Sequence, residues 1–184
     1  MSLLLGKPGS TSAEYDTTAE DAFKYQENDE DPWVSDDMDD GQPQTVWIEF
    51  PSAITPVKFA FNNRQDPEYD ECDPEVFEFV GANDCSGGKD IAWEVIKRVE
   101  DVRWDNRGQE RQWNVEEKYR KTFRCFGIRV HIITTDTPEY FGASLHNFRM
   151  WVEDGKCMFG WYSRSYIFYS FRWLVCAAIW ALLI

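Results

Sequence analysis

The stretch 74-PEVFEFVGANDCSGGKDIAWEVIKRV-99 decides the fold class of this chain. It contains two runs rich in β-branched and aromatic residues, 76–80 and 91–96, which are typical of β-strands. Between them lies a polar, glycine-containing segment that begins with 81-GAND-84, as expected of a turn. The stretch therefore predicts a strand, a turn and a second strand.

The same alternation of apolar and polar residues recurs on both sides of this stretch. The clearest runs lie at 45–50, 57–61, 124–134 and 145–152. Residues 14–40 are dense in Asp and Glu, and residues 100–122 are highly charged without a clear period, so both segments are predicted to be loops. Short strands separated by turns predict an all-β protein, a jelly-roll β-sandwich with long loops.

Composition and charge narrow the possible functions. The chain has 184 residues, of which 43% are hydrophobic and 16% aromatic, so we expect one folded domain rather than a disordered chain. The formal net charge of −14 argues against nucleic acid as a partner, because phosphate binding needs a basic surface. Cations, basic proteins and neutral sugars stay open as partners. The alternative is an acidic surface that only keeps the fold soluble.

The cysteines and histidines argue against a zinc site. The five cysteines include no CxxC pair, and the chain has two histidines. Cys72 and Cys85 flank the first strand of the opening stretch, and they could form a disulfide if the protein is exported. The odd number leaves at least one thiol outside any disulfide within the chain.

Both ends of the chain depart from the strand pattern. The N-terminal MSLLLGKPGS has an apolar run too short for a signal peptide. From Tyr166 the chain reads YIFYSFRWLVCAAIWALLI, with Arg172 as its single charge, whereas a membrane span needs about 20 apolar residues. This hydrophobic tail is compatible with a helix, and three interpretations stay open: a membrane anchor, a helix packed on a partner, and a non-native extension. We expect a domain over residues 1–155 and the tail over residues 156–184.

A series of short motifs carries a resemblance to a known family. In chain order they are 6-GKPGSTSA-13, 19-AED-21, 33-WVS-35, 47-WIEF-50, 57-VKFAFNNR-64, 81-GAND-84 followed by Trp93, 126-FGIRV-130 and 148-FRMWV-152. Together they resemble a discoidin domain, also called the coagulation factor 5/8 type C domain, of the galactose-binding-like jelly-roll class. The resemblance implies a β-sandwich that binds its ligands with loops at one end.

The resemblance gives the GAND segment a structural role. It implies a turn between strands in which Gly81 takes a positive φ, while Asn83 and Asp84 hydrogen-bond their own backbone. It also implies that Trp93 packs in the core after the turn. The turn itself is not expected to bind a ligand.

The resemblance also implies a calcium site. Family members often hold Ca²⁺ near an Ala-x-Asp-Gly segment, which corresponds to 19-AED-21 with Ala22 in place of the glycine. Calcium takes roughly six to eight oxygen ligands. Asp21, Asn28 and Asp29, with nearby backbone carbonyls, could supply them for a structural ion. The alternative is a solvated acidic loop.

A second implied site lies at 62-NNRQD-66. Fucose-binding members of the family carry Asn-Arg-x-Asp, and this chain keeps Asn63, Arg64 and Asp66. It lacks the adjacent Cys pair and the second Arg that follow in those members, so Arg64 could instead only pair with a loop carboxylate. The resemblance implies a ligand site of Asn63, Arg64 and Asp66, with Trp33 as the aromatic platform for a sugar ring.

Two further tryptophans, Trp104 and Trp113, also lie in or next to predicted loops. Like Trp33, they could offer a ring face to a sugar. The alternative for each of the three is core packing, which is the more common role of a loop tryptophan in a β-sandwich.

No catalytic constellation is present in the sequence. It contains no G-x-S-x-G, Cys/His pairing or phosphate loop, and no pair of carboxylates stands out for glycosidase chemistry. We therefore predict no catalytic residues. The resemblance implies a non-catalytic, lectin-like module that binds cell-surface glycans or glycoproteins, located outside the cell or at its surface. The alternative is a protein-binding adhesion or matrix module without affinity for free sugar.

The acidic charge also argues against anionic lipid as a ligand. Membrane contact is therefore expected only through the C-terminal tail. Because single sugar sites bind weakly, a functional oligomer stays open.

Overall fold

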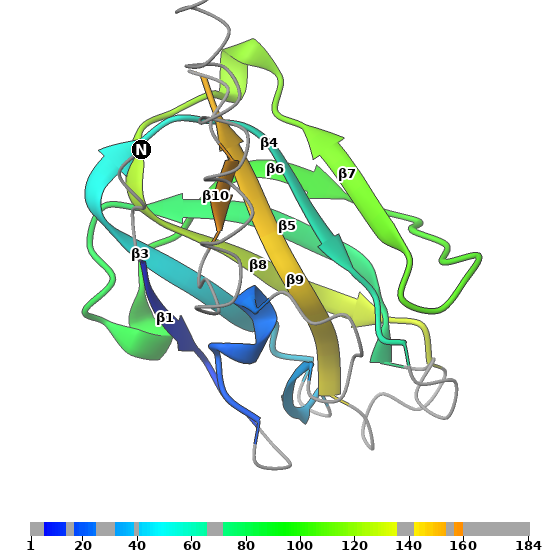
Figure 1. Cartoon of the computed structure of the whole chain (residues 1–184). Coiled ribbons are helices and arrows are strands. Elements are labelled where there is room, and N and C mark those ends of the chain that lie inside the picture. The colour runs from blue at the N-terminus through cyan, green and yellow to red at the C-terminus, as the bar shows by residue number, and fades with distance from the viewer. Residues whose placement is uncertain are drawn as a thin grey trace, which may run out of the picture.

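The computed structural model describes residues 6–13, 17–24, 32–38, 41–65, 72–135, 142–153 and 157–159. These residues form two antiparallel β-sheets that pack face to face (Figure 1). The described part of the chain contains short 3₁₀ turns and no α-helix. The predicted all-β jelly-roll sandwich is thus confirmed.

Each sheet combines strands that are distant in sequence. The first sheet has the order β1 (Lys7–Ser10), β3 (Gln44–Ile54), β8 (Phe123–Ile133), β5 (Pro74–Ala82) and β6 (Glu94–Val99). The second sheet has the order β10 (Cys157–Phe159), β9 (Gly142–Val152), β4 (Pro56–Asn62) and β7 (Glu110–Asn114), and β2 (Trp33–Asp37) also pairs with β9. The 3₁₀ turns are η1 (Asp21–Phe23), η3 (Gly88–Asp90) and η4 (Glu117–Tyr119).

The inner faces of the two sheets enclose an aromatic core, the main core. Phe59 and Phe61 of β4 and Phe77 and Phe79 of β5 have no exposed surface, as their alternation along the strands predicts. The ring centroids of Phe59 and Phe79 lie 4.3 Å apart across the two sheets. Burying one such side chain stabilises the fold by about 2–3 kcal/mol.

A smaller cluster lies on the outer face of the first sheet. Trp47, Ala82, Ile91 and Cys125 form it, with Trp93 packed against them. The ring centroids of Trp47 and Trp93 are 5.8 Å apart. Trp93 therefore packs outside the sandwich, which corrects the expectation that it enters the main core.

A disulfide between Cys85 and Cys125 ties the β5–β6 connection to this outer cluster. Their Cα atoms are 6.3 Å apart, within the usual range for a disulfide. The suggested Cys72–Cys85 pair is wrong, because Cys72 is buried at the other end of β5. The bridge closes a segment of 40 residues, which corresponds to about 4 kcal/mol in a chain-entropy estimate.

The GAND segment differs in part from its predicted conformation. Gly81 lies within β5 and is not among the glycines with positive φ. It is needed for another reason, because a Cβ there would come 2.3 Å from the ring of Phe123. Asp84 does form the expected local turn, since its carboxylate accepts hydrogen bonds from the backbone N–H and the hydroxyl of Ser86.

The strand bounds also differ from the predicted runs in several places. The charged segment 100–122 contains β7 and η4, and the predicted strand 91–96 is β6 at Glu94–Val99. β1 and β2 are additional strands, and β10 pairs with β9 beyond residue 155, so the second sheet extends past the predicted domain end.

The described residues contain no helix of the length and hydrophobicity that a membrane crossing requires. The hydrophobic tail from Tyr166 lies outside the described residues. Its three interpretations therefore stay open.

Candidate functional site at the loop end

The topology gathers three connections at one end of the sandwich, here called the loop end. β4, β6 and β8 finish there, and their antiparallel partners β5, β7 and β9 begin there (Figure 1). Backbone hydrogen bonds join these connections: Asn63 N–H donates to Gln109 O, and Thr134 N–H donates to Asp73 O. Residues from distant parts of the chain thus meet at this end.

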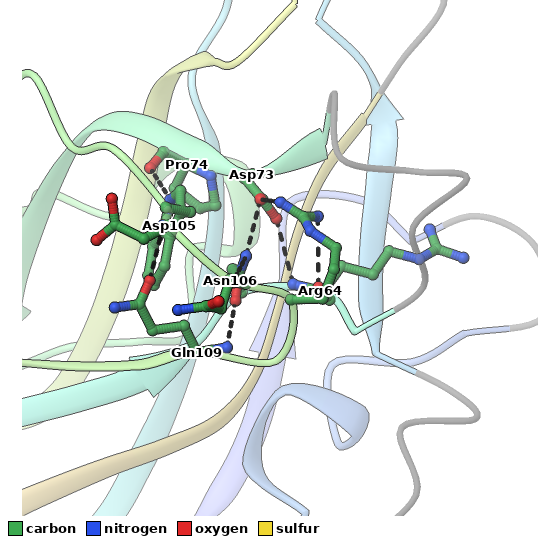
Figure 2. A network of polar contacts seen from close by, with 9 residues as sticks. Arg64, Asp73, Pro74, Asp105, Asn106 and Gln109 are labelled. Carbon is green, nitrogen blue, oxygen red and sulfur yellow. Dashed lines mark hydrogen bonds and ion pairs between the residues drawn. The ribbon is translucent and has the colours of Figure 1, made fainter.

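Asp73, immediately before β5, lies at the centre of a polar network (Figure 2). Its side chain is 1% exposed. One carboxylate oxygen accepts hydrogen bonds from Asn63 Nδ2 at 2.9 Å and Arg107 Nη2 at 2.5 Å, and the other accepts from the backbone N–H of Arg64 at 3.2 Å. Burial raises the pKa of the Asp73 carboxyl, although the bonds from Asn63 and Arg107 oppose the rise.

Asn63 joins the network to the loop before β7. Its Nδ2 also donates to Asn106 O at 3.2 Å, and its Oδ1 accepts from the backbone N–H of Gln109 at 2.6 Å. The residue has no exposed surface. Asn63 was expected to contact a ligand, but here its whole carboxamide holds two loops together.

The backbone of Arg64 is held by hydrogen bonds at both its N–H and its carbonyl group. Its N–H donates to Asp73, and its carbonyl accepts from Gly108 N–H at 3.2 Å and from Arg107 Nη1 at 3.4 Å. Arg64 is partly exposed, and Figure 2 shows its side chain extending away from the network. Asp66 lies outside the described residues, so its contribution to the predicted ligand site stays a prediction.

The tryptophans belong to the core rather than to an exposed surface. Trp33 has no exposed surface, and its indole N–H donates to Ser12 O at 3.0 Å. It offers no ring face to a sugar, contrary to the expectation of a platform. Trp104 and Trp113 pack against the main core and are partly buried, and Trp104 donates to Pro74 O at 3.0 Å.

Asp21, the described residue of the predicted calcium site, already bonds to neighbouring residues. Asp21 lies in η1, and one of its oxygens accepts from the N–H and hydroxyl of Thr18, at 2.6 and 2.9 Å. The other oxygen lies 2.6 Å from Lys24 Nζ. A calcium ion at Asp21 would therefore compete with the Lys24 ammonium group. Asn28 and Asp29 lie outside the described residues, and the calcium site stays a prediction.

Metal ions in proteins are usually held by acidic, histidine and cysteine side chains. Within the described ranges, no three of them are placed to hold a metal ion.

Sequence reasoning did not find Asp73, Arg107 and Gln109. Asp73 and Arg107 are separated by 34 positions, and no motif links them. The only local sign is the position of Asp73 directly before Pro74, at a strand start, where a polar side chain can reach neighbouring loops.

Comparison of the sequence with models of protein families and with curated proteins finds no match. Solved structures do match the fold. One is a family 32 carbohydrate-binding module of Clostridium perfringens in complex with GalNAc-β-1,3-galactose, with a TM-score of 0.58 and 14% identity over 79% of this chain and 94% of that chain.

Two further solved structures have the same fold. The family 32 module of the C. perfringens protein NanJ, in complex with galactose, has a TM-score of 0.55 and 14% identity over 79% of this chain and 92% of that chain. The family 32 module of AlyQ, in complex with 4,5-unsaturated mannuronic acid, has a TM-score of 0.58 and 10% identity over 82% of this chain and 98% of that chain. The chain therefore has the galactose-binding-like jelly-roll fold of the discoidin, or coagulation factor 5/8 type C, domains.

Proposed function

We propose that this chain is a non-catalytic carbohydrate-binding module whose ligand site lies at the loop end, beside Arg64. The observation that carries this proposal is the arrangement of Arg64. Its backbone is held on both sides by the Asp73 network, while its side chain extends away from that network (Figure 2). A guanidinium group can donate hydrogen bonds to neighbouring sugar hydroxyls, and because the backbone of Arg64 is already held, only its side chain would have to be ordered on binding.

The solved neighbours support a saccharide as the ligand class. They are named as carbohydrate-binding modules, and their complexes contain GalNAc-β-1,3-galactose, galactose and an unsaturated mannuronic acid. The Cys85–Cys125 disulfide supports an extracellular or cell-surface location, because disulfides persist in oxidising environments. Catalysis is not part of the proposal, because the proposed site only positions hydrogen-bonding groups.

The expected affinity is weak. A shallow site with one arginine and an acceptor such as Asp66 would bind a sugar with about 4–6 kcal/mol, which corresponds to roughly millimolar to tens-of-micromolar Kd. Useful binding would then come from several copies acting together.

The proposal is tested on an immobilised glycan panel with an artificially tetramerised form of the full chain. Arg64→Ala should abolish binding while the chain stays folded with a cooperative melting transition. Arg120→Ala is the matched control, because Arg120 is also partly exposed but lies in the β7–β8 connection at the opposite end. If Arg64→Ala and Arg120→Ala bind alike, the site is not beside Arg64. If the folded tetramer gives no signal on any glycan, the protein-binding adhesion module becomes the better account.

A further inference from the structure

A groove lies between the edge strand β6 and the turn η4. Its volume is about 370 Å³, within the range typical of small-ligand sites. It is lined by Val95, Ile96, Lys97, Arg98, Glu116 and Tyr119. The turn η4 follows β7, at the end of that strand remote from the Asp73 network (Figure 1). The groove runs from this turn along β6, which finishes at the loop end.

The groove has an exposed apolar wall. Val95 is 42% exposed and Tyr119 is 47% exposed, and they are two of the three large hydrophobic residues that the described chain exposes. An ion pair between Lys121 and Glu94 links the η4 segment to the start of β6. Within the turn, Tyr119 N–H donates to Glu116 O. Tyr119 is therefore held beside β6, with the Lys118 ammonium group 4.6 Å from the centroid of its ring and 47% of the residue exposed.

The groove also has one uncompensated positive charge. Arg98 pairs with Glu78 and Glu100, and Glu116 pairs with Lys118. Lys97 has no ion pair or hydrogen bond with any described residue. In a chain of net charge −14, such a cation beside an exposed ring is suited to an anionic ligand.

A β-bulge in β6 argues for a compact ligand rather than an added strand. Phe79 pairs with Lys97 and the next residue, Val80, pairs with Val95, so Ile96 has no partner on β5. Bulges and charged side chains are the features by which edge strands resist pairing with another extended chain. The bulge therefore makes an extended peptide a poor fit to this edge.

We propose that this groove is a second saccharide site, which binds a sugar residue carrying a carboxylate group. The sugar ring would lie against Tyr119, its carboxylate would pair with Lys97, and Glu116 would accept from a hydroxyl. The choice of a saccharide rests on the proposed function, but the location does not depend on the loop-end site.

The test is an NMR titration of the ¹⁵N-labelled full chain with sodium glucuronate, and separately with methyl glucoside, which has a similar ring and no carboxylate. Glucuronate should shift the backbone amides of Val95, Lys97 and Tyr119 more strongly than the glucoside does. Lys97→Gln should weaken glucuronate binding about tenfold, because it removes one charge-assisted hydrogen bond. Lys89→Gln is the charge-matched control, since Lys89 is exposed in η3. This control should bind glucuronate like the unmodified chain.

Three results would overturn this second site. They are the absence of shifts in the groove with glucuronate, an equal effect of Lys97→Gln and Lys89→Gln, and shifts with a tetraglutamate peptide but not with glucuronate. The last result would identify an acidic peptide as the ligand. Arg64→Ala separates the two proposals, because it should leave glucuronate binding at the groove intact while it removes binding at the loop end.

Discussion

The main core and the Asp73 network are both buried, but they are built by different rules. The core consists of apolar side chains that recur at every second position of long strands, and each contacts several others. The network consists of single polar side chains from separate loops, such as Asn63, Asp73 and Arg107, and each bonds to specific partners. A core position should therefore tolerate another apolar residue, whereas a network position should not tolerate loss of its partner.

The largest expected effect is in the core. Phe59 stacks on Phe79 at 4.3 Å and on Trp113 at 5.3 Å, so Phe59→Ala should lower the free energy of unfolding by about 3–5 kcal/mol. Phe59→Leu should cost much less because it keeps the site apolar and nearly filled. Urea denaturation measures both. Tyr119→Ala is the exposed control, and a loss as large as that of Phe59→Ala would contradict the assigned core.

The network should show a smaller loss with strong coupling between partners. Asp73→Ala removes the carboxylate that accepts from both Arg107 and Asn63, and it should lower the free energy of unfolding by about 3 kcal/mol. Arg107→Ala in the Asp73→Ala background should add little, because the pair is already broken. A double-mutant cycle measures this coupling. Additive losses would mean that the two residues act independently and that the network is not a unit.

Glu78, on the outer face of the first sheet, lies outside both regions. It tests whether ion pairing makes the stability of the fold depend on pH. Burial alone would raise the pKa of Glu78, but His131 Nε2, 2.9 Å away, and two hydrogen bonds from Arg129 lower the pKa below its ordinary value of 4.5. Because the folded-state pKa is lowered, the stabilisation is present above the unfolded-state value and is lost as pH falls through the folded-state value.

Glu78→Gln should therefore cost about 1 kcal/mol at pH 7 and progressively less as pH falls below 4.5. Chemical denaturation at pH 7, 5 and 3 measures the difference from the unmodified chain. Glu100→Gln is the control, because Glu100 is more exposed and bonds to Arg98 alone. A difference for Glu78→Gln that stays constant with pH would contradict this account.

The smallest expected effect concerns calcium. If Asp21, Asn28 and Asp29 bind an ion of extracellular affinity, 1 mM calcium should stabilise the fold by about 1 kcal/mol or less. Differential scanning calorimetry with calcium and with chelator measures this, and Asp29→Ala should remove the gain. Magnesium serves as the control ion. Equal melting temperatures with calcium and chelator would leave this segment as a solvated acidic loop.

The two buried regions also explain which parts could be predicted from the sequence. The core strands were predictable because residues such as Phe77 and Phe79 repeat with the period of a strand. β7 was missed because its inward-facing Trp113 lies among charged neighbours and the strand is only five residues long.

The candidate site was predictable only in part. Arg64 was found through a local motif, whereas its partners Asp73 and Arg107 come from other loops and follow no sequence period. Trp33 was misjudged because its loop-like neighbours hid its pairing with Leu145 of β9, which places it inside the sandwich. Pairings of this kind depend on tertiary structure, and no local pattern encodes them.

The position of β8 has a consequence for how the chain folds. β8 lies between β3 and β5 in the first sheet, although about 70 residues separate it from the end of β3. During synthesis at roughly 5–20 residues per second, β3 would wait about 4–16 seconds and β5 about 3–10 seconds for their central partner to be completed. Their apolar edges are open to wrong pairing during that time. Refolding in the millisecond-to-second range and a benefit from chaperones during synthesis are the expected signs of this delayed closure.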